Sequence, residues 1–260
     1  MTKKQKLVEL KDFLDEKVQL YNKPEFIITD PVSIPHLFTK KEDIEIAGFF
    51  AATIAWGQRP TILKNARKLM QWMDDDPYQF ILNFDDHDLK PFHKFVHRTF
   101  NGTDCVFFLK AIQNIYKNHS GLEKIFMDAL EKDSLHLKES IYHARNIFFT
   151  ADHLRRSEKH FSNPNEGSAS KRINMFLRWM IRRDLSGVDF GIWKNISPSL
   201  LTCPLDVHSG RVARKLGLLK RKQNDWKAAT ELTHNLLKLD ANDPVKYDFA
   251  LFGLGVFERF

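Results

Sequence analysis

Cysteine is scarce in this sequence: Cys105 and Cys203 are the only two, and they lie far apart. The chain therefore cannot form a disulfide scaffold, a four-cysteine zinc site or a cysteine-ligated iron–sulfur cluster. The histidines follow neither the HExxH pattern nor another metal-binding spacing. We expect two buried cysteines, no metal and no cofactor.

Long hydrophobic runs are also missing. The longest nearly apolar stretch runs from Ile44 to Trp56, includes Glu45 and is too short to span a bilayer. The basic first six residues lead into amphipathic, charged sequence, which is not typical of a secretory signal. We therefore expect a cytoplasmic protein without a membrane partner.

No stretch alternates polar and apolar residues over strand length, and no Ser/Gly/Pro-rich linker or internal repeat divides the chain. Hydrophobic residues make up 43% of the sequence, and its 22 Phe residues are spread from Phe13 to Phe260, which is ample for a core. Apolar residues at helical spacing predict an all-α fold. We expect helices at about residues 3–20, 44–56, 60–73, 77–84, 88–100, 104–117, 122–131, 135–149, 170–183, 207–216, 227–239 and 244–253. The helix at 44–56, capped by Asp43, is apolar nearly all round and should lie at the centre of a bundle.

Positive charge is concentrated in one part of the chain. The net charge is +7, and residues 151–222 hold 15 Lys or Arg against 6 Asp or Glu. An excess of this sign favours a polyanionic partner such as nucleic acid, because neutralised phosphates release counterions. A solvated basic face is an equally simple interpretation of the charge alone.

A loop of turn formers and small residues lies within this basic region. Residues 163–170 lead into a helix whose apolar positions form one face. Lys171, Asn174, Arg178 and Arg182 fall on the opposite face, which we expect to be an exposed cationic surface. The start of such a helix, where backbone N–H groups and the helix dipole act together, can bind a phosphate.

Three segments of the sequence carry a resemblance to a known superfamily. Gly167-Ser168-Ala169-Ser170-Lys171, followed by Asn174, resembles the hairpin of the helix-hairpin-helix (HhH-GPD) DNA glycosylases. Pro204-Leu205-Asp206-Val207-His208, with Arg211, is similar to their Asp-x-His-x-x-Arg segment. Ala55-Trp56-Gly57-Gln58 resembles an early turn whose glutamine reaches into the DNA. The resemblance covers about residues 44–217 in outline.

Differences from the usual superfamily pattern indicate which branch of the superfamily this sequence resembles. Ala169 stands where the hairpin usually has its second glycine, and Lys171 and Asp206 are 35 positions apart. The spacing is closer to the archaeal 8-oxoguanine glycosylase type than to endonuclease III, whose iron–sulfur cysteines are also absent. The segments 174–179 and 247–255 are, in addition, similar to a family of bacterial proteins of unassigned function, the DUF2400 group.

The resemblance implies a two-lobed HhH-GPD fold. One lobe would be a helix bundle over residues 44–185 that includes the hairpin. The other would join residues 1–43 to residues 186–260, with Lys171 and Asp206 in the cleft between the lobes. The partner implied is damaged double-stranded DNA, bound by a monomer.

The activity implied is that of a DNA base-excision glycosylase that removes an oxidised or damaged purine. A carboxylate, Asp206, would stabilise the positive charge that develops on the sugar, and the amine of Lys171 would attack C1′. A Schiff base formed by Lys171 would add abasic-site lyase activity. The resemblance also assigns DNA contacts to Gly167, Ser168, Ala169, Ser170, Arg172, Asn174, Arg178, Gln58, His208 and Arg211, and a base pocket to Phe249 and Phe252.

Each of these residues has a simpler explanation. Asp206 is also a good N-cap for the helix that follows it, and Lys171 could bind a phosphate without catalysis. Gln58 could be a solvated turn residue, and Phe249 and Phe252 could belong to the core. Two other functions stay open: a non-catalytic HhH nucleic-acid-binding protein, and an α-helical scaffold whose basic face binds acidic proteins.

Overall fold

The computed structural model describes residues 2–260, apart from the side chain of Lys3. The protein is 60% helix and 2% strand, which confirms the all-α prediction. Contacts between Cα atoms divide the chain into two compact units. Unit 1 contains the N-terminal segment up to Phe26, Ser134–Leu137 and Pro164–Phe260, and unit 2 contains Ile27–Asp133 and Lys138–Asn163.

These units do not follow the lobe boundaries expected from the sequence. Residues 164–185, expected in the helix bundle that begins at residue 44, group instead with the C-terminal segment, and residues 27–43 group with the bundle. The hairpin and Lys171 therefore belong to the same unit as Asp206.

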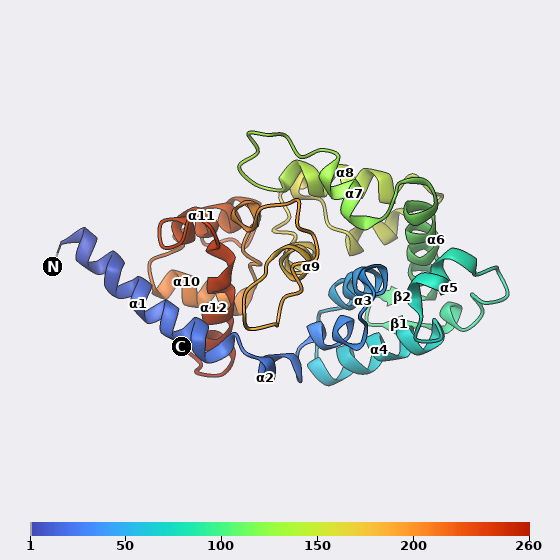
Figure 1. The fold of residues 1–260 in the computed structure, drawn as a ribbon, viewed down its shortest axis with the longest axis horizontal. Helices are drawn as coiled ribbons and strands as arrows, with labels where there is room; N and C mark the ends of the chain where they lie inside the picture. Colours follow the sequence, from blue (N-terminus) through green and yellow to red (C-terminus); the bar gives the residue numbers. More distant parts are fainter. Residues whose placement is uncertain (1) are drawn as a thin grey trace. The chain divides into compact units, whose positions relative to one another are not determined.

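Unit 1 is built from five helices and three short 3-10 turns (Figure 1). They are α1 (Lys3–Tyr21), η5 (Pro164–Glu166), α9 (Lys171–Ile181), η6 (Pro198–Leu200), α10 (Val207–Lys215), α11 (Trp226–Leu237), η7 (Pro244–Lys246) and α12 (Tyr247–Val256). α2 (Pro24–Ile27) joins the two units in the sequence.

Helix α12 organises unit 1, because both α1 and α10 pack against it. Leu251 and Leu254 of α12 join a buried cluster that includes Leu14 of α1 and Val212 of α10. Gly253 permits the close approach of α1, since a Cβ atom there would lie 2.1 Å from the ring of Tyr21. Burial of these apolar side chains stabilises the unit.

Unit 2 contains the remaining elements (Figure 1). They are η1 (Pro31–Ser33), η2 (Pro35–Leu37), α3 (Lys41–Thr53), α4 (Arg59–Trp72), α5 (Pro77–Asn83), η3 (Phe92–Lys94), β1 (Val96–His97), β2 (Phe100–Asn101), α6 (Gly102–Asn118), α7 (Leu122–Met127), α8 (Lys138–Phe148) and η4 (Arg155–His160).

Helix α3 lies at the centre of unit 2, as its apolar sequence predicts. Its residues from Asp43 to Thr53 are all buried, and Phe49 packs against Phe108 and Phe148. Asp43 does not cap this helix, which begins at Lys41. Its carboxylate accepts a hydrogen bond from the backbone N–H of Tyr78, at the start of α5.

The helix predicted over residues 88–100 is wrong. This segment contains the short helix η3 and the antiparallel strands β1 and β2, with Arg98 at a left-handed φ of 54° in the turn. Pro91 disfavours a continuous helix, because it lacks a backbone N–H and its ring crowds the preceding turn. The strand pairing then satisfies backbone groups that a helix would have paired.

Candidate functional site

The loop before α9 is held in place by its own hydrogen bonds. Gly167 has a φ of 89°, its N–H donates to Pro164, and its carbonyl accepts from the N–H of Trp226 at 2.9 Å. Ser170 has a left-handed φ of 46°, and its N–H donates to the hydroxyl of Ser168 at 3.1 Å. Two N–H groups expected to face a phosphate are thus used within the protein.

Asn174 supports the same loop from inside the unit. Its side chain is 1% exposed, and its Nδ2 donates to the carbonyl of Ala169 at 3.0 Å. The predicted exposed cationic face is therefore wrong for Asn174. Its amide instead fixes the loop one turn before its own position on α9.

The two predicted catalytic residues lie next to each other. Lys171 is the first residue of α9, Asp206 is the N-cap of α10, and Nζ of Lys171 lies 3.5 Å from Oδ2 of Asp206. Their side chains are 30% and 24% exposed, so both reach solvent. Residues 35 positions apart in the sequence therefore form an ion pair where two helices begin.

Capping fixes the orientation of Asp206. Oδ1 accepts hydrogen bonds from the N–H groups of His208 and Ser209 at 2.8 and 2.9 Å, while Oδ2 faces Lys171. The carbonyl of Asp206 also accepts from the side chain of Asn224 at 3.0 Å. Capping and the lysine contact, which the sequence presents as alternatives, therefore use different oxygens of one carboxylate.

The environment keeps Asp206 ionised. Burial raises its pKa, but the positive charge of Lys171 and the two backbone N–H groups outweigh burial and hold the pKa below its usual range. A carboxylate that stays charged can stabilise positive charge beside it and can orient an attacking group.

The rest of the polar face of α9 is buried, not exposed. Arg178 and Arg182 are 4% and 2% exposed, so the predicted cationic surface is wrong at both positions. Arg178 forms ion pairs with Asp189 and Asp248, and Arg182 pairs with Asp189 at 3.0 Å. These carboxylates compensate the cost of burying two guanidinium groups.

Asp248 interacts both with Arg178 and with the Lys171–Asp206 ion pair. Its role is not predicted from the sequence. Burial raises its pKa to about 6, although the charge of Arg178 acts to lower it. The charges of Asp206 and Lys171 also shift its pKa, so the groups interact electrostatically. A signal was present, because Asp248 is the only charged residue of the otherwise apolar helix α12.

Three further predicted residues of unit 1 are close in sequence to Lys171 or Asp206: Arg172, His208 and Arg211. Arg172 is half-buried, and burial lowers its pKa to about 10. His208 and Arg211 are exposed, and Arg211 donates to the carbonyl of Gly255 at 3.0 Å, which ties α10 to α12. This contact gives Arg211 a structural role within unit 1.

The two candidate base-pocket residues differ in their burial. Phe249 is 0% exposed, and the guanidinium carbon of Arg178 lies 4.4 Å from the centre of its ring. Phe249 is therefore a core residue in this structure. Phe252 is half-buried, with ring contacts to Phe26 and Phe257.

Gln58 belongs to unit 2. It is exposed and is the N-cap of α4, but its side chain makes no capping bond. Gly57 before it has a φ of 99°, and the side chain of Arg98 lies against it. The carbonyl of Trp56 lies 3.0 Å from Nε2 of His97. The turn is thus fixed from the neighbouring strand, with Gln58 projecting from it.

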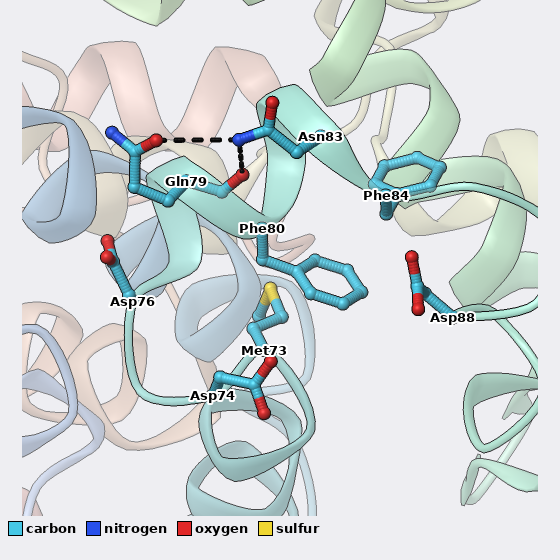
Figure 2. Close-up of a pocket in the computed structure, with 8 residues that line it drawn as sticks. All are labelled: Met73, Asp74, Asp76, Gln79, Phe80, Asn83, Phe84 and Asp88. Carbon is cyan, nitrogen blue, oxygen red and sulfur yellow. Dashed lines mark hydrogen bonds between the residues drawn. The ribbon is translucent and has the colours of Figure 1, made fainter.

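Unit 2 also contains a pocket of about 330 Å³ that none of the predicted residues lines (Figure 2). Figure 2 shows the carboxylates of Asp74, Asp76 and Asp88 around it, together with the rings of Phe80 and Phe84. Such a pocket repels a polyanion.

Residues 2–260 contain neither a metal-binding cluster nor a helix that could span a membrane. No group of three or more His, Cys, Asp or Glu side chains is arranged to hold a metal ion there. In the same residues, no helix is both long and apolar enough to cross a membrane. Both cysteines are buried and free, as predicted.

Fold and site together define an all-α protein with a lysine–aspartate ion pair at the start of two helices. A family model described as "Protein of unknown function (DUF2400)" matches residues 30–257, and the chain belongs to this family. The predicted membership of this family is thereby confirmed. No curated protein and no solved structure gives a significant match to the chain.

Proposed function

We propose that the protein is a DNA base-excision glycosylase with abasic-site lyase activity, of the HhH-GPD type. Its substrate is a damaged purine in double-stranded DNA, and it acts as a monomer. The observation that carries the proposal is the 3.5 Å distance between Nζ of Lys171 and Oδ2 of Asp206. A resemblance in two separate segments requires this pair to meet, and chance would rarely bring it together.

Each residue has a defined task in this reaction. Lys171 gives up a proton, and its neutral amine attacks C1′ of the damaged nucleotide. The C1′–N9 bond breaks, and the electron pair leaves with the purine, which takes up a proton. Asp206 stabilises the positive charge that the sugar carries as the bond breaks. The nitrogen attached to C1′ then loses a proton, the C1′–O4′ bond breaks and O4′ takes up a proton, which leaves a protonated imine between C1′ and Lys171. Loss of a proton from C2′ of this imine expels the 3′-phosphate.

Contacts with α12 support the two helices that carry Lys171 and Asp206. Arg178 belongs to the same helix as Lys171 and pairs with Asp248, while Asp206 caps α10, which packs on α12. The helices that carry the two reacting side chains are therefore both attached to α12, α9 through the buried Arg178–Asp248 ion pair and α10 through packing. Rigid support of this kind keeps catalytic groups in a productive geometry.

Borohydride trapping tests the proposal. Borohydride reduces an imine to a stable amine, so a lyase incubated with abasic duplex DNA becomes covalently attached. We expect an adduct with the wild type and none with Lys171→Ala, measured as a mobility shift in a denaturing gel. DNA binding without an adduct in the wild type would instead support the non-catalytic nucleic-acid-binding protein. Absence of DNA binding would leave the scaffold for acidic proteins.

A further inference from the structure

Two segments of unit 2 contain no acidic residue. Residues 46–73 and residues 89–103 together hold seven Lys or Arg and neither Asp nor Glu. Their combined charge equals the net charge of the whole chain, +7, because acidic residues elsewhere offset the excess of cations over residues 151–222. None of these seven cations was among the predicted site residues.

The two segments pack against each other along the length of α4. At its N-terminal end, Arg98 lies against Gly57. In the middle, Nδ2 of Asn65 lies 2.9 Å from Nδ1 of His97 and 3.4 Å from the carbonyl of Val96. At the C-terminal end, the ring of Trp72 contacts the rings of Phe92, which begins η3, and Phe95, which directly precedes β1. Helix α4 and residues 92–98 thus form one continuous surface.

The cations of this surface face solvent. Lys64, Arg67 and Lys68 of α4 are exposed, as are Lys94 and Arg98 of the second segment. Among residues 2–260, no acidic side chain forms an ion pair with any of these five. Elsewhere in unit 2, by contrast, Lys110 pairs with Asp86 and Lys124 with Asp128.

We propose that α4 and residues 92–98 bind the phosphate backbone of duplex DNA, as a second contact surface separate from the lysine–aspartate pair. The partner follows from charge: several exposed cations that form no ion pair among residues 2–260 are complementary to the phosphates of a nucleic acid. The choice of DNA as the polyanion rests on the proposed function. Gln58 and Arg98, on either side of Gly57, form the end of this surface.

The acidic pocket limits the surface at its other end. Asp74 and Asp76 follow directly after α4, and with Asp88 they line the pocket of Figure 2. Their negative charges repel phosphates from the C-terminal end of α4. A bound backbone is therefore kept away from the residues that follow α4, and runs from Lys64, Arg67 and Lys68 toward the turn at Gln58.

Salt dependence of binding tests this surface without requiring catalysis. The probe is a duplex that contains a tetrahydrofuran abasic analogue, which cannot form an imine. Affinity is measured by fluorescence anisotropy over a range of NaCl concentrations. The test variant is Lys64→Gln/Arg67→Gln/Lys68→Gln, in which glutamine preserves helix propensity. The control, Lys110→Gln/Lys117→Gln/Lys124→Gln, removes the same charge from α6 and α7 of the same unit.

We expect the test variant to lose affinity by about tenfold or more at low salt, and the slope of log affinity against log salt to fall by about two to three. The control should keep the wild-type slope, and both variants should keep the wild-type thermal unfolding transition. An unchanged slope in the test variant, or an equal loss in the control, would overturn the proposal.

The result of the salt-dependence experiment can be distinguished from the result of borohydride trapping, which tests the proposed function. If wild-type protein fails to form a borohydride adduct but the slopes differ as expected, the surface stands and the glycosylase chemistry fails. If the adduct forms and the slopes do not differ, the chemistry stands and this surface fails.

Discussion

Asp206 shows how one side chain can cap a helix and face a reactive amine at the same time. Its Oδ1 accepts two backbone N–H groups, and its Oδ2 lies 3.5 Å from Nζ of Lys171. The cap fixes the rotamer of Asp206, so the carboxylate is held toward Lys171 by local hydrogen bonds. Capping and catalysis are therefore compatible at this position.

Substitution of Asp206 by asparagine separates the two roles. Asparagine is an equally good N-cap, so we expect the free energy of unfolding to change by less than about 1 kcal/mol. Loss of the negative charge should lower the rate of base release or imine formation by about a hundredfold or more. The rates are measured in single-turnover experiments. A rate equal to that of the wild type would show that the charge has no part in the reaction.

Asp248 should make stability depend on pH. Burial raises its pKa from 3.8 to about 6, so the folded state binds a proton more tightly than the unfolded state. This contribution to stability is present below about pH 4 and is lost as the pH rises through about 6. Asp248→Asn removes the titration. The difference in unfolding free energy between wild type and variant, from urea titrations at several pH values, should fall over this interval, and a rising difference would contradict the assignment.

At the scale of elements, the hairpin loop and α9 form a single supported unit. The loop carbonyl of Ala169 accepts from Asn174, one turn into the helix, and the carbonyl of Gly167 accepts from Trp226 at the start of α11. Lys171 is thus placed by contacts on both sides of it. Movement of the loop would displace the amine directly.

Asn174→Ala tests this support. Loss of a buried hydrogen bond leaves the carbonyl of Ala169 without its partner, so we expect a loss of stability of about 1–3 kcal/mol. We also expect slower borohydride trapping, because the position of Lys171 is no longer fixed. Asn235→Ala is the matched control, since Asn235 donates in the same way to the carbonyl of Leu218, at 2.8 Å.

The control variant should lose stability but keep the trapping rate. Equal slowing in both variants would mean that the effect of Asn174 is general destabilisation. An unchanged trapping rate in Asn174→Ala would mean that the loop needs no such support.

The sequence predicts elements better than it predicts contacts. The all-round apolar pattern of α3 correctly places it at the centre of unit 2, because periodicity reports burial directly. The same reasoning fails for Arg178, since a polar helical face is normally solvated. Its partners Asp189 and Asp248 lie 11 and 70 positions away in the sequence, beyond any local pattern.

The β-hairpin formed by β1 and β2, at residues 96–101, could not be predicted for a related reason. Its strands have only two residues each, too few to show alternation, and its position depends on Asn65 and Trp56 of another segment. Lys171 and Asp206 are predicted as a pair only by the two motifs together. Neither residue alone is distinguishable from an exposed lysine or a helix cap.

At the scale of the whole molecule, charge is distributed unevenly in both units. Unit 1 pairs its two most buried arginines with aspartates. In unit 2, Lys64, Arg67 and Lys68 of α4 are exposed and form no ion pair with an acidic side chain among residues 2–260. Buried cations serve the fold, whereas exposed cations remain available to a ligand. Membership of the DUF2400 family covers both units, because the match extends from residue 30 to residue 257.

Mapping the borohydride adduct tests the central claim most directly. After trapping on abasic duplex DNA, nuclease and protease digestion followed by mass spectrometry locates the modified residue. We predict a single sugar-derived modification on the peptide that contains Lys171, and none on that peptide from Lys171→Ala. An adduct on another lysine, or no adduct with protein that binds the same DNA, would contradict the assignment of Lys171 as the nucleophile.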